Sequence, residues 1–259
     1  MILTNDNKYE ESRRKQLKID EFNSVEHPFM EQLKELGWND DANEVIELKM
    51  QQQPSESFRT SFSEVVLMPK LRKALKQIND FLTDSQIDEV ANRITAYQGG
   101  TLLENNERIF NLLVEGTSVS RNEQTGEQSP SVRYIDFDHP ENNIFTAISQ
   151  FKVAIPGTDH HIIPDIVLFL NGLPIVVVEA KSPKVSEPLS EAIDQLMRYS
   201  EQRGDTGEGN PALFQYNQFL IVTCRNEAKA GTITTHREKY FYRWTDPYPM
   251  TLNDLTHGQ

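Results

Sequence analysis

The sequence contains a single cysteine among its 259 residues, Cys224, so no internal disulfide can form and the chain suits a reducing cytosol. Long apolar runs are also missing. None reaches the roughly 18 residues of a membrane helix, because Asn171-Gly172 interrupts the longest one. The opening residues, "MILTNDNKYEESRRKQLK", lack the apolar segment of a secretion signal. Together these absences predict a cytoplasmic protein that does not associate with a membrane.

Basic residues are scarce as well. The chain has 26 lysines and arginines against 39 aspartates and glutamates, which gives a formal net charge of −13. Proteins that bind nucleic acid on their own are usually basic. If this chain acts on DNA or RNA, we therefore expect other subunits to hold most of the polymer. Hydrophobic residues make up 37% and charged residues 25%, which is typical of a globular protein.

The first half of the chain is predicted to be mainly helical. Apolar residues recur at helical spacing in residues 24–38 and again in 83–97. A possible capping box, Ser61 and Glu64, predicts a further helix that reaches residue 79 and is disturbed by Pro69. Residues 39–60 are polar and indicate a loop or a weak strand. We expect residues 1–60 to form a helical N-terminal extension that packs on the core.

From residue 131 onward the pattern favours strands. Five segments are rich in β-branched and aromatic residues, at 131–137, 144–155, 162–170, 174–180 and 217–224. Between the last two, residues 186–202 have helical spacing, with Ser186 as candidate N-cap and Pro188 in the first turn. This order predicts an α/β core over residues 61–245, with a mixed sheet flanked by helices. Residues 246–259 resemble a linker that leaves the domain.

One very apolar segment, "DIVLFLNGLPIVVVEAKSP" (165–183), carries ionisable residues at both of its ends. Asn-Gly is a strong hairpin signal, and a three-residue turn at 171–173 would place Asp165 directly opposite Glu179. Lys181 lies two residues further along and projects from the same face of the sheet. A register one step off would move Asp165 out of line, so this geometry depends on the length of the turn.

Two carboxylates at this spacing repel each other, and a divalent cation removes the conflict. Mg²⁺ prefers oxygen ligands, so the candidate ligands are Asp165, Glu179 and the backbone carbonyl of Ala180. Lys181 is the candidate for orienting or deprotonating a water and for offsetting developing charge. Such a site predicts hydrolysis of phosphodiesters. From the spacing alone, the alternative is a solvated strand end with an ion pair, beside an acid in a turn.

The combination of "PD" and "EAK" resembles the catalytic core of the PD-(D/E)xK nuclease superfamily. The surrounding stretches "YIDFDHPENNIFTAISQFKV", "EAIDQLMRYS" and "PALFQYNQFLIVT" resemble the N-terminal nuclease domain of the R subunit of type I restriction enzymes, over about residues 60–245. The resemblance implies a restriction-endonuclease-like fold and Mg²⁺-dependent cleavage of double-stranded DNA in a prokaryotic cytoplasm. It also implies partner subunits for methylation (M) and specificity (S). Ile163 departs from the arginine that this family usually has before Pro-Asp.

The resemblance also assigns residues. Asp165 and Glu179 match the family's metal-binding acids, and Lys181 matches its catalytic lysine. Gln195 and Tyr199 match its Gln-x-x-x-Tyr motif, and their spacing independently places them on one helical face. We expect this face to lie near Lys181 and to position either DNA phosphate or the lysine and its water.

Many members of this superfamily also use a glutamate from the first helix. Glu26 is the candidate here, and Glu21, Glu31 and Glu64 compete with it. Complete R subunits are much longer and carry an ATP-driven translocase, whereas this sequence has no G-x-x-x-x-G-K-[ST] phosphate loop. We therefore expect a fragment that ends before the motor, with ATP bound only by the full-length subunit.

Two other functions remain open. One alternative to the nuclease module is a docking module that attaches an R subunit to its partners, and the other is a stand-alone nuclease that acts on another nucleic acid. Loss of the catalytic acids would favour the docking module, but they are present. Motor sequence in the intact gene would exclude the stand-alone nuclease.

Overall fold

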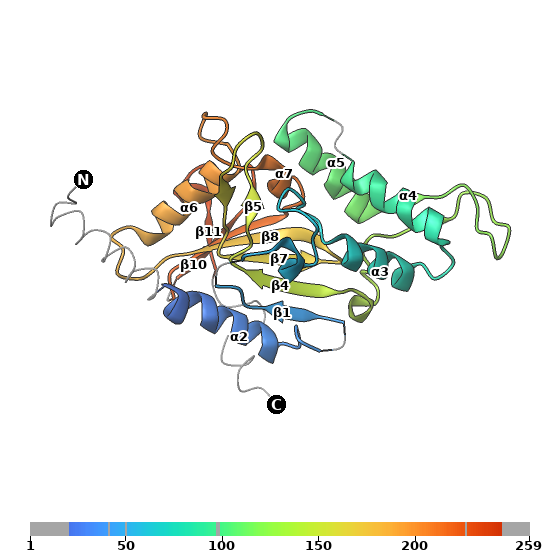
Figure 1. Cartoon of the computed structure of the whole chain (residues 1–259), viewed down its shortest axis with the longest axis horizontal. Coiled ribbons are helices and arrows are strands. Elements are labelled where there is room, and N and C mark those ends of the chain that lie inside the picture. Colours follow the sequence, from blue (N-terminus) through green and yellow to red (C-terminus); the bar gives the residue numbers. More distant parts are fainter. Residues whose placement is uncertain (1–20, 41, 50, 97–98, 226, 245–259) are drawn as a thin grey trace.

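The computed structural model describes residues 21–40, 42–49, 51–96, 99–225 and 227–244 (Figure 1). Its central feature is a mixed sheet of seven strands in the order β1-β4-β7-β8-β9-β10-β11. β4, β7 and β8 are antiparallel neighbours, whereas β1 runs parallel to β4, and β9 runs parallel to β8. The strands are β1 (Glu44–Ile46), β4 (Phe145–Ser149), β7 (Ile166–Leu170), β8 (Leu173–Ala180), β9 (Phe219–Thr223), β10 (Ala228–Gly231) and β11 (Tyr242–Arg243).

Helices cover both faces of this sheet, as the sequence predicted. α2 (His27–Glu35) packs against β1 and β4, and α6 (Pro188–Tyr199) packs against β8 and β9 (Figure 1). Alternate residues of β8 point to opposite faces of the sheet and pack in different hydrophobic clusters. Val178 joins the cluster under α2, and Val177 joins the larger core under α6. Because both faces are buried, the central strands are continuous apolar runs. None of the helices in the described ranges is long and apolar enough to cross a membrane.

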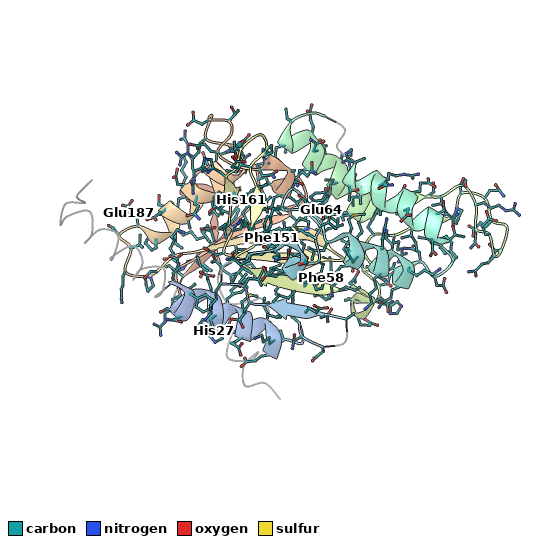
Figure 2. The ribbon with its side chains drawn as sticks, in the orientation of Figure 1. His27, Phe58, Glu64, Phe151, His161 and Glu187 are labelled. Carbon is teal, nitrogen blue, oxygen red and sulfur yellow. The ribbon has the colours of Figure 1, made fainter. Side chains whose placement is uncertain are left out.

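The larger core extends to one end of the sheet, where three helices gather (Figure 1). These are α3 (Met68–Ile78), α4 (Asp84–Thr95) and α5 (Leu102–Glu115); the short α7 (Pro211–Phe214) lies against α5. Figure 2 shows Phe151 near the centre of the molecule. Its ring packs edge-on against Phe169 at 5.2 Å, and the Arg59 guanidinium lies 3.8 Å from its centroid. Arg59 also donates to the carbonyl of Lys152 at 2.8 Å, so it ties the chain before α3 to the end of β4.

Two short hairpins lie outside the main sheet. One pairs β2 (Thr117–Ser118) with β3 (Ser131–Val132), and the other pairs β5 (Val153–Ala154) with β6 (His161–Ile162). The predicted strands at 131–137, 144–155 and 162–170 are therefore shorter or divided. The helix α5 was not predicted, although Thr101 and Glu104 form a capping box at its start.

Two predicted helix starts are wrong. α3 begins at Met68 rather than Ser61, and Pro69 lies in its first turn, where the missing N–H costs no helical hydrogen bond. Glu64 instead accepts bonds from the backbone and hydroxyl of Thr60. Residue Glu187, not Ser186, precedes α6, and its side chain makes no capping bond.

The segment before residue 60 contributes the edge strand β1 to the sheet, in addition to α2. Whether it forms an extension distinct from the core stays a prediction. Tyr97, at the end of the predicted helix 83–97, and the predicted linker 246–259 lie outside the described residues.

Candidate active site

The turn between β7 and β8 has two residues rather than the predicted three. Leu170 pairs with Leu173, which leaves Asn171 and Gly172 at the turn, with φ angles of 53° and 80°. Such positive angles at both positions are typical of the tight hairpin turn that Asn-Gly favours. A side chain at Gly172 would also meet the backbone carbonyl oxygen of Leu67 at 2.6 Å. The turn is therefore fixed both by its own conformation and by its packing.

A β-bulge restores the predicted register at the other end of the hairpin. Next to the turn Phe169 pairs with Pro174, but Leu168 pairs with Val176, so Ile175 is an extra residue on β8. From there the pairs continue to Ile166 and Val178. The next positions along the strands bring Asp165 opposite Glu179. The predicted alignment of the two acids is thus right, although the turn length from which it was argued is wrong.

The two acids and the lysine form one buried cluster. Asp165 is 6% exposed, Glu179 0% and Lys181 5%, so the alternative of a solvated strand end is excluded. Lys181 Nζ lies 2.9 Å from Glu179 Oε1, and the N–H of Ala180 donates to Asp165 Oδ2 at 2.8 Å. The backbone of Ala180 therefore lies against the carboxylates, while its carbonyl as a metal ligand stays a prediction.

One oxygen of this cluster has no donor. Glu179 Oε2 is buried and accepts no hydrogen bond from the described residues. Burial and the adjacent Asp165 carboxylate raise the pKa of Glu179 well above its usual value, against the attraction of Lys181. Burial also raises the pKa of Asp165, although Lys181 and the Ala180 N–H oppose it. Without a cation, a proton shared by the two acids relieves the repulsion that Lys181 does not offset.

Lys181 keeps its charge despite its burial. Burial alone lowers the pKa of its ammonium, but the attraction of Glu179 and Asp165 outweighs this and raises the pKa above its usual value. The backbone N–H of Lys181 donates to Thr223 of β9 at 2.9 Å, so the parallel β8–β9 pairing holds its main chain in place.

Glu26 reaches the same cluster from the N-terminal side of α2. It is 3% exposed, and its Oε2 accepts a 2.8 Å bond from the amide of Gln150. The same Gln150 nitrogen donates to Asp165 Oδ1 at 3.3 Å. Burial, reinforced by the Asp165 charge, raises the pKa of Glu26 to about 8. The structure therefore brings the favoured first-helix candidate to the two acids.

Of the competing glutamates, only Glu21 joins the site. Its Oε2 accepts the N–H of Ser182 at 3.1 Å, and burial raises its pKa to about 7 despite the opposing charge of Lys181. Glu31 instead pairs with Lys34 on the exposed side of α2. Glu64 bonds to Thr60 in the loop before α3 and does not join the cluster.

Gln150 is the site residue that sequence reasoning missed. It follows β4 at a positive φ of 51°, and its N–H donates to the carbonyl of Asp165 at 2.7 Å. The only sequence signal is that Gln150 follows "FTAIS" as a polar residue inside the strand predicted at 144–155. No local spacing relates it to Glu26, which lies 124 positions away.

Gln195 and Tyr199 lie on the face of α6 that is directed at the acids. Gln195 Nε2 donates to the Tyr199 hydroxyl at 2.8 Å, and this hydroxyl donates to the carbonyl of Ile163 at 3.4 Å. Burial and the charges of Glu179 and Asp165 raise the pKa of Tyr199 above its usual range. The pair thus holds the strand end that carries Asp165, and within the described residues its hydrogen bonds do not include Lys181.

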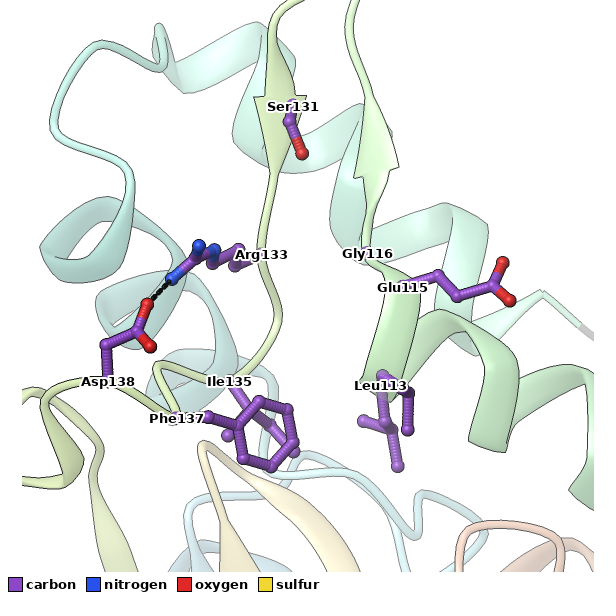
Figure 3. Close-up of a pocket in the computed structure, with 9 residues that line it drawn as sticks. Leu113, Glu115, Gly116, Ser131, Arg133, Ile135, Phe137 and Asp138 are labelled. Atoms are coloured by element: carbon purple, nitrogen blue, oxygen red, sulfur yellow. Dashed lines mark hydrogen bonds and ion pairs between the residues drawn. The ribbon is translucent and has the colours of Figure 1, made fainter.

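The described residues form at least two hollows on the surface. A pocket of about 600 Å³ is bounded by the loop 184–187 and the first turns of α6, directly after Ser182. A second pocket, of about 300 Å³, lies between the end of α5 and residues 131–138 (Figure 3). An ion pair of 2.6 Å between Arg133 and Asp138 borders it. None of the candidate acids lines this second pocket. The pocket beside α6, in contrast, is lined by the loop that follows Lys181.

A mixed sheet with helices on both faces, and with acids and a lysine converging at the ends of two central strands, places this protein in the restriction-endonuclease-like class. A sequence model of the family "Type I restriction enzyme R protein N terminus" matches residues 18–239, so the chain belongs to that family. Curated relatives carry corresponding names. The endonuclease subunit of the type I restriction enzyme HindI from Haemophilus influenzae is 29% identical over 84% of this chain and 20% of its own length.

In two further relatives the matched region is a similar share of the relative's own length. The putative MjaIXP endonuclease subunit of Methanocaldococcus jannaschii is 26% identical over 88% of this chain and 21% of its own length. The SsaAORF53P endonuclease subunit of Staphylococcus saprophyticus is 28% identical over 90% of this chain and 22% of its own length. The chain therefore spans about a fifth of the length of the curated relatives it matches.

Proposed function

We propose that this chain is the nuclease module of a type I restriction enzyme R subunit and that it cleaves phosphodiester bonds of double-stranded DNA with the help of Mg²⁺. The single observation that carries the proposal is the buried Glu179 Oε2, which lacks a donor beside a second buried carboxylate. Two adjacent buried carboxylates destabilise the metal-free protein, and a bound divalent cation would remove their repulsion and coordinate the oxygen that lacks a donor. Membership of the R-subunit family supports this assignment.

The residues present fit a divalent cation. Asp165 and Glu179 would hold it, with the carbonyl of Ala180 as the third protein ligand. When bound, Mg²⁺ polarises a phosphate oxygen and lowers the pKa of a coordinated water. Lys181 carries a positive charge in this structure, so its proposed role is to offset charge on the phosphate and to orient the water. Deprotonation of water by Lys181 would first require that its ammonium lose a proton.

Gln195 and Tyr199 act as positioning residues in this proposal. The Tyr199 hydroxyl holds the Ile163 carbonyl, two residues before Asp165, and Gln195 fixes the orientation of that hydroxyl. The second N–H of the Gln195 amide remains available to donate to a DNA phosphate at the edge of the site.

We expect Tyr199→Phe to reduce the rate of DNA cleavage by about ten- to a hundredfold, because one positioning hydrogen bond is lost while the ring stays packed. Tyr134→Phe is the matched control, since its buried hydroxyl donates to the Val90 carbonyl at 2.9 Å far from the acids. Melting temperature and cleavage rate are measured for both variants. Equal cleavage by Tyr199→Phe and the wild type would contradict the role.

DNA is expected to be held mainly by other parts of the enzyme. The net charge of −13 opposes binding of a polyanion by this chain alone. We propose that methylation and specificity subunits, together with an ATP-driven motor in the full-length subunit, supply the DNA in a prokaryotic cytoplasm. Cleavage by the 259-residue chain is then weak and falls steeply as salt is added.

The test is conversion of supercoiled plasmid by the purified chain at low ionic strength, with Mg²⁺ or with a chelator. We expect relaxed and linear products with Mg²⁺, and background levels for Asp165→Asn. Asp194→Asn removes the same charge from an exposed position that pairs with Arg203, so it should cleave like the wild type. Products that persist in Asp165→Asn would refute the nuclease assignment at this site and leave the docking module as the better reading.

A further inference from the structure

We propose that the outward face of the hairpin formed by β5 and β6 binds the backbone of the DNA, with Lys152 and His161 contacting phosphates beside the bond that is cleaved. This inference rests on the proposed function and deepens it, because it assigns substrate-binding residues outside the acidic cluster. Phosphate contacts of this kind fix the position of a duplex without reading its sequence.

The β5–β6 hairpin extends directly from the acidic cluster. Its pairing continues in the same register to Gln150, whose N–H donates to the carbonyl of Asp165 at 2.7 Å. Lys152 stands opposite Ile163 in this register. Because a strand rises about 3.3 Å per residue, Ile163 lies roughly 7 Å and His161 roughly 13 Å from Asp165 along the hairpin. Nucleotides of one DNA strand advance about 3.4 Å each along the helix axis, so these positions reach phosphates about two to four nucleotides from the acids.

One face of the hairpin is turned outward. Val153 and Ile162 are buried in the larger core. The residues that alternate with them are more accessible, since Lys152 and His161 are half-buried and Ile163 is exposed. Alternate residues of a strand point to opposite faces, so Lys152 and His161 lie together on the outward face. The hairpin lies between α6 and α7 in the view of Figure 1.

The ring of Phe62 gathers these two side chains. Lys152 Nζ lies 4.8 Å from the ring centroid, and the imidazole of His161 packs edge-on against the ring at 5.5 Å. Among the described residues, no carboxylate pairs with the Lys152 ammonium and no acceptor bonds to its Nζ. By contrast, Lys70 and Lys229 each pair with a glutamate, at 2.5 and 2.7 Å. A lysine held by a ring keeps its N–H donors for a phosphate.

The charge at this hairpin is positive on a chain that is negative overall. Burial lowers the pKa of the His161 imidazole, and the charges of Lys152 and His160 lower it further, against the opposing charge of Asp159. A neutral imidazole still has one N–H that donates to a phosphate. The net charge of −13 repels DNA, so a cation without a carboxylate partner close to the acids is the kind of group that attracts the backbone to the site.

The experiment is binding of a short labelled DNA duplex to the purified chain, followed by fluorescence anisotropy over a series of salt concentrations. A chelator is present, so that cleavage does not occur. Lys152→Gln should weaken binding by about tenfold at low salt and reduce the slope of log K against log salt by about 0.9, because one phosphate contact is lost. Lys229→Gln removes the same charge from a lysine that pairs with Glu238, and should keep the wild-type affinity and slope.

His161→Phe tests the second contact. Phenylalanine keeps the ring beside Phe62 and removes the N–H. We expect binding to weaken by about two- to tenfold, because one hydrogen bond is lost. At about pH 8 the salt slope should stay unchanged, because the imidazole that is removed is neutral there.

The kinetics of plasmid cleavage with Mg²⁺ separate a binding role from a structural one. Lys152→Gln should raise KM for DNA by about tenfold and leave kcat within about twofold of the wild type, because a contact to a flanking phosphate is the same before and during the reaction. A loss of kcat together with a lower melting temperature, at unchanged KM, would assign Lys152 to folding and overturn the contact.

The outcomes distinguish this inference from the proposed function. If the wild type cleaves DNA and Lys152→Gln binds it with the wild-type affinity and salt slope, the hairpin contact is refuted and the proposed function survives. If Lys152→Gln weakens binding as expected but Asp165→Asn still cleaves, the proposed function fails and the hairpin remains a DNA-binding surface.

A gain of affinity guards against a loss of folding in Lys152→Gln. Ile163→Arg places a second cation on the outward face, opposite Lys152. It should tighten DNA binding by about tenfold at low salt and steepen the salt slope by about 0.9. Unchanged binding by Ile163→Arg would overturn the proposal, because the added guanidinium would then meet no phosphate. Absence of salt-dependent binding by the wild type at low salt would overturn it as well.

Discussion

Glu179→Gln is expected to lower DNA cleavage to background while making the metal-free protein more stable at about pH 8. The side chain is fully buried, and its Oε2 has no donor in the present structure. Glutamine keeps the volume, removes the charge and provides an N–H that can donate to Asp165. The expected gain is about 1–3 kcal/mol of unfolding free energy, because repulsion between two buried carboxylates is removed. Lys181 keeps Asp165 as a charged neighbour.

Opposite effects on activity and stability distinguish a cation site from a structural ion pair. If the Glu179–Lys181 pair served stability, the same substitution would lower the melting temperature in a chelator. The control is Glu187→Gln, an exposed acid that precedes α6 (Figure 2). We expect it to leave both cleavage and the melting temperature unchanged. Melting curves with a chelator and plasmid cleavage with Mg²⁺ provide the two measurements.

The metal-free protein is also expected to lose stability as the pH rises. The pKa of Glu26 is raised from 4.5 to about 8 in the folded protein, and that of Glu21 to about 7. Between pH 4.5 and the raised pKa of each glutamate, the folded chain holds a proton that the unfolded chain has released. Rising pH therefore favours unfolding. The contribution is fully present below pH 4.5 and is lost as the pH passes through about 8. Asp165 and Glu179 act in the same direction.

From about pH 5 to about pH 9, we expect a loss of roughly 1–3 kcal/mol, or about 3–10 °C in melting temperature, in the presence of a chelator. Mg²⁺ should remove most of this loss, because bound cations favour the ionised acids. Glu26→Gln should have a smaller pH dependence than the wild type, whereas Glu31→Gln, on the exposed side of α2, should retain it. A wild-type melting temperature that rises over this interval would contradict the assigned protonation states.

Only part of the candidate site was accessible from the sequence. Asp165, Glu179 and Lys181 could be found because they flank one continuous hairpin, whose Asn-Gly turn and apolar strands are local signals. Even there, two errors cancelled. The turn is one residue shorter than predicted, and the bulge at Ile175, which has no clear signal in an apolar run, restores the register.

Local patterns thus indicated the α/β fold class and placed the two acids and the lysine on one hairpin, because these features depend on residues that are near in sequence; the family resemblance pointed to Gln195 and Tyr199. Tertiary structure alone decided which glutamates join them. Glu21, Glu26 and Gln150 meet at Asp165 through a π-helical turn and through contacts such as that between Gln150 and Glu26, 124 positions apart. Periodicity reports which face of an element is buried, but not which distant element covers it. The parallel pairing of β1 with β4 and the packing of α2 on the sheet supplied that information.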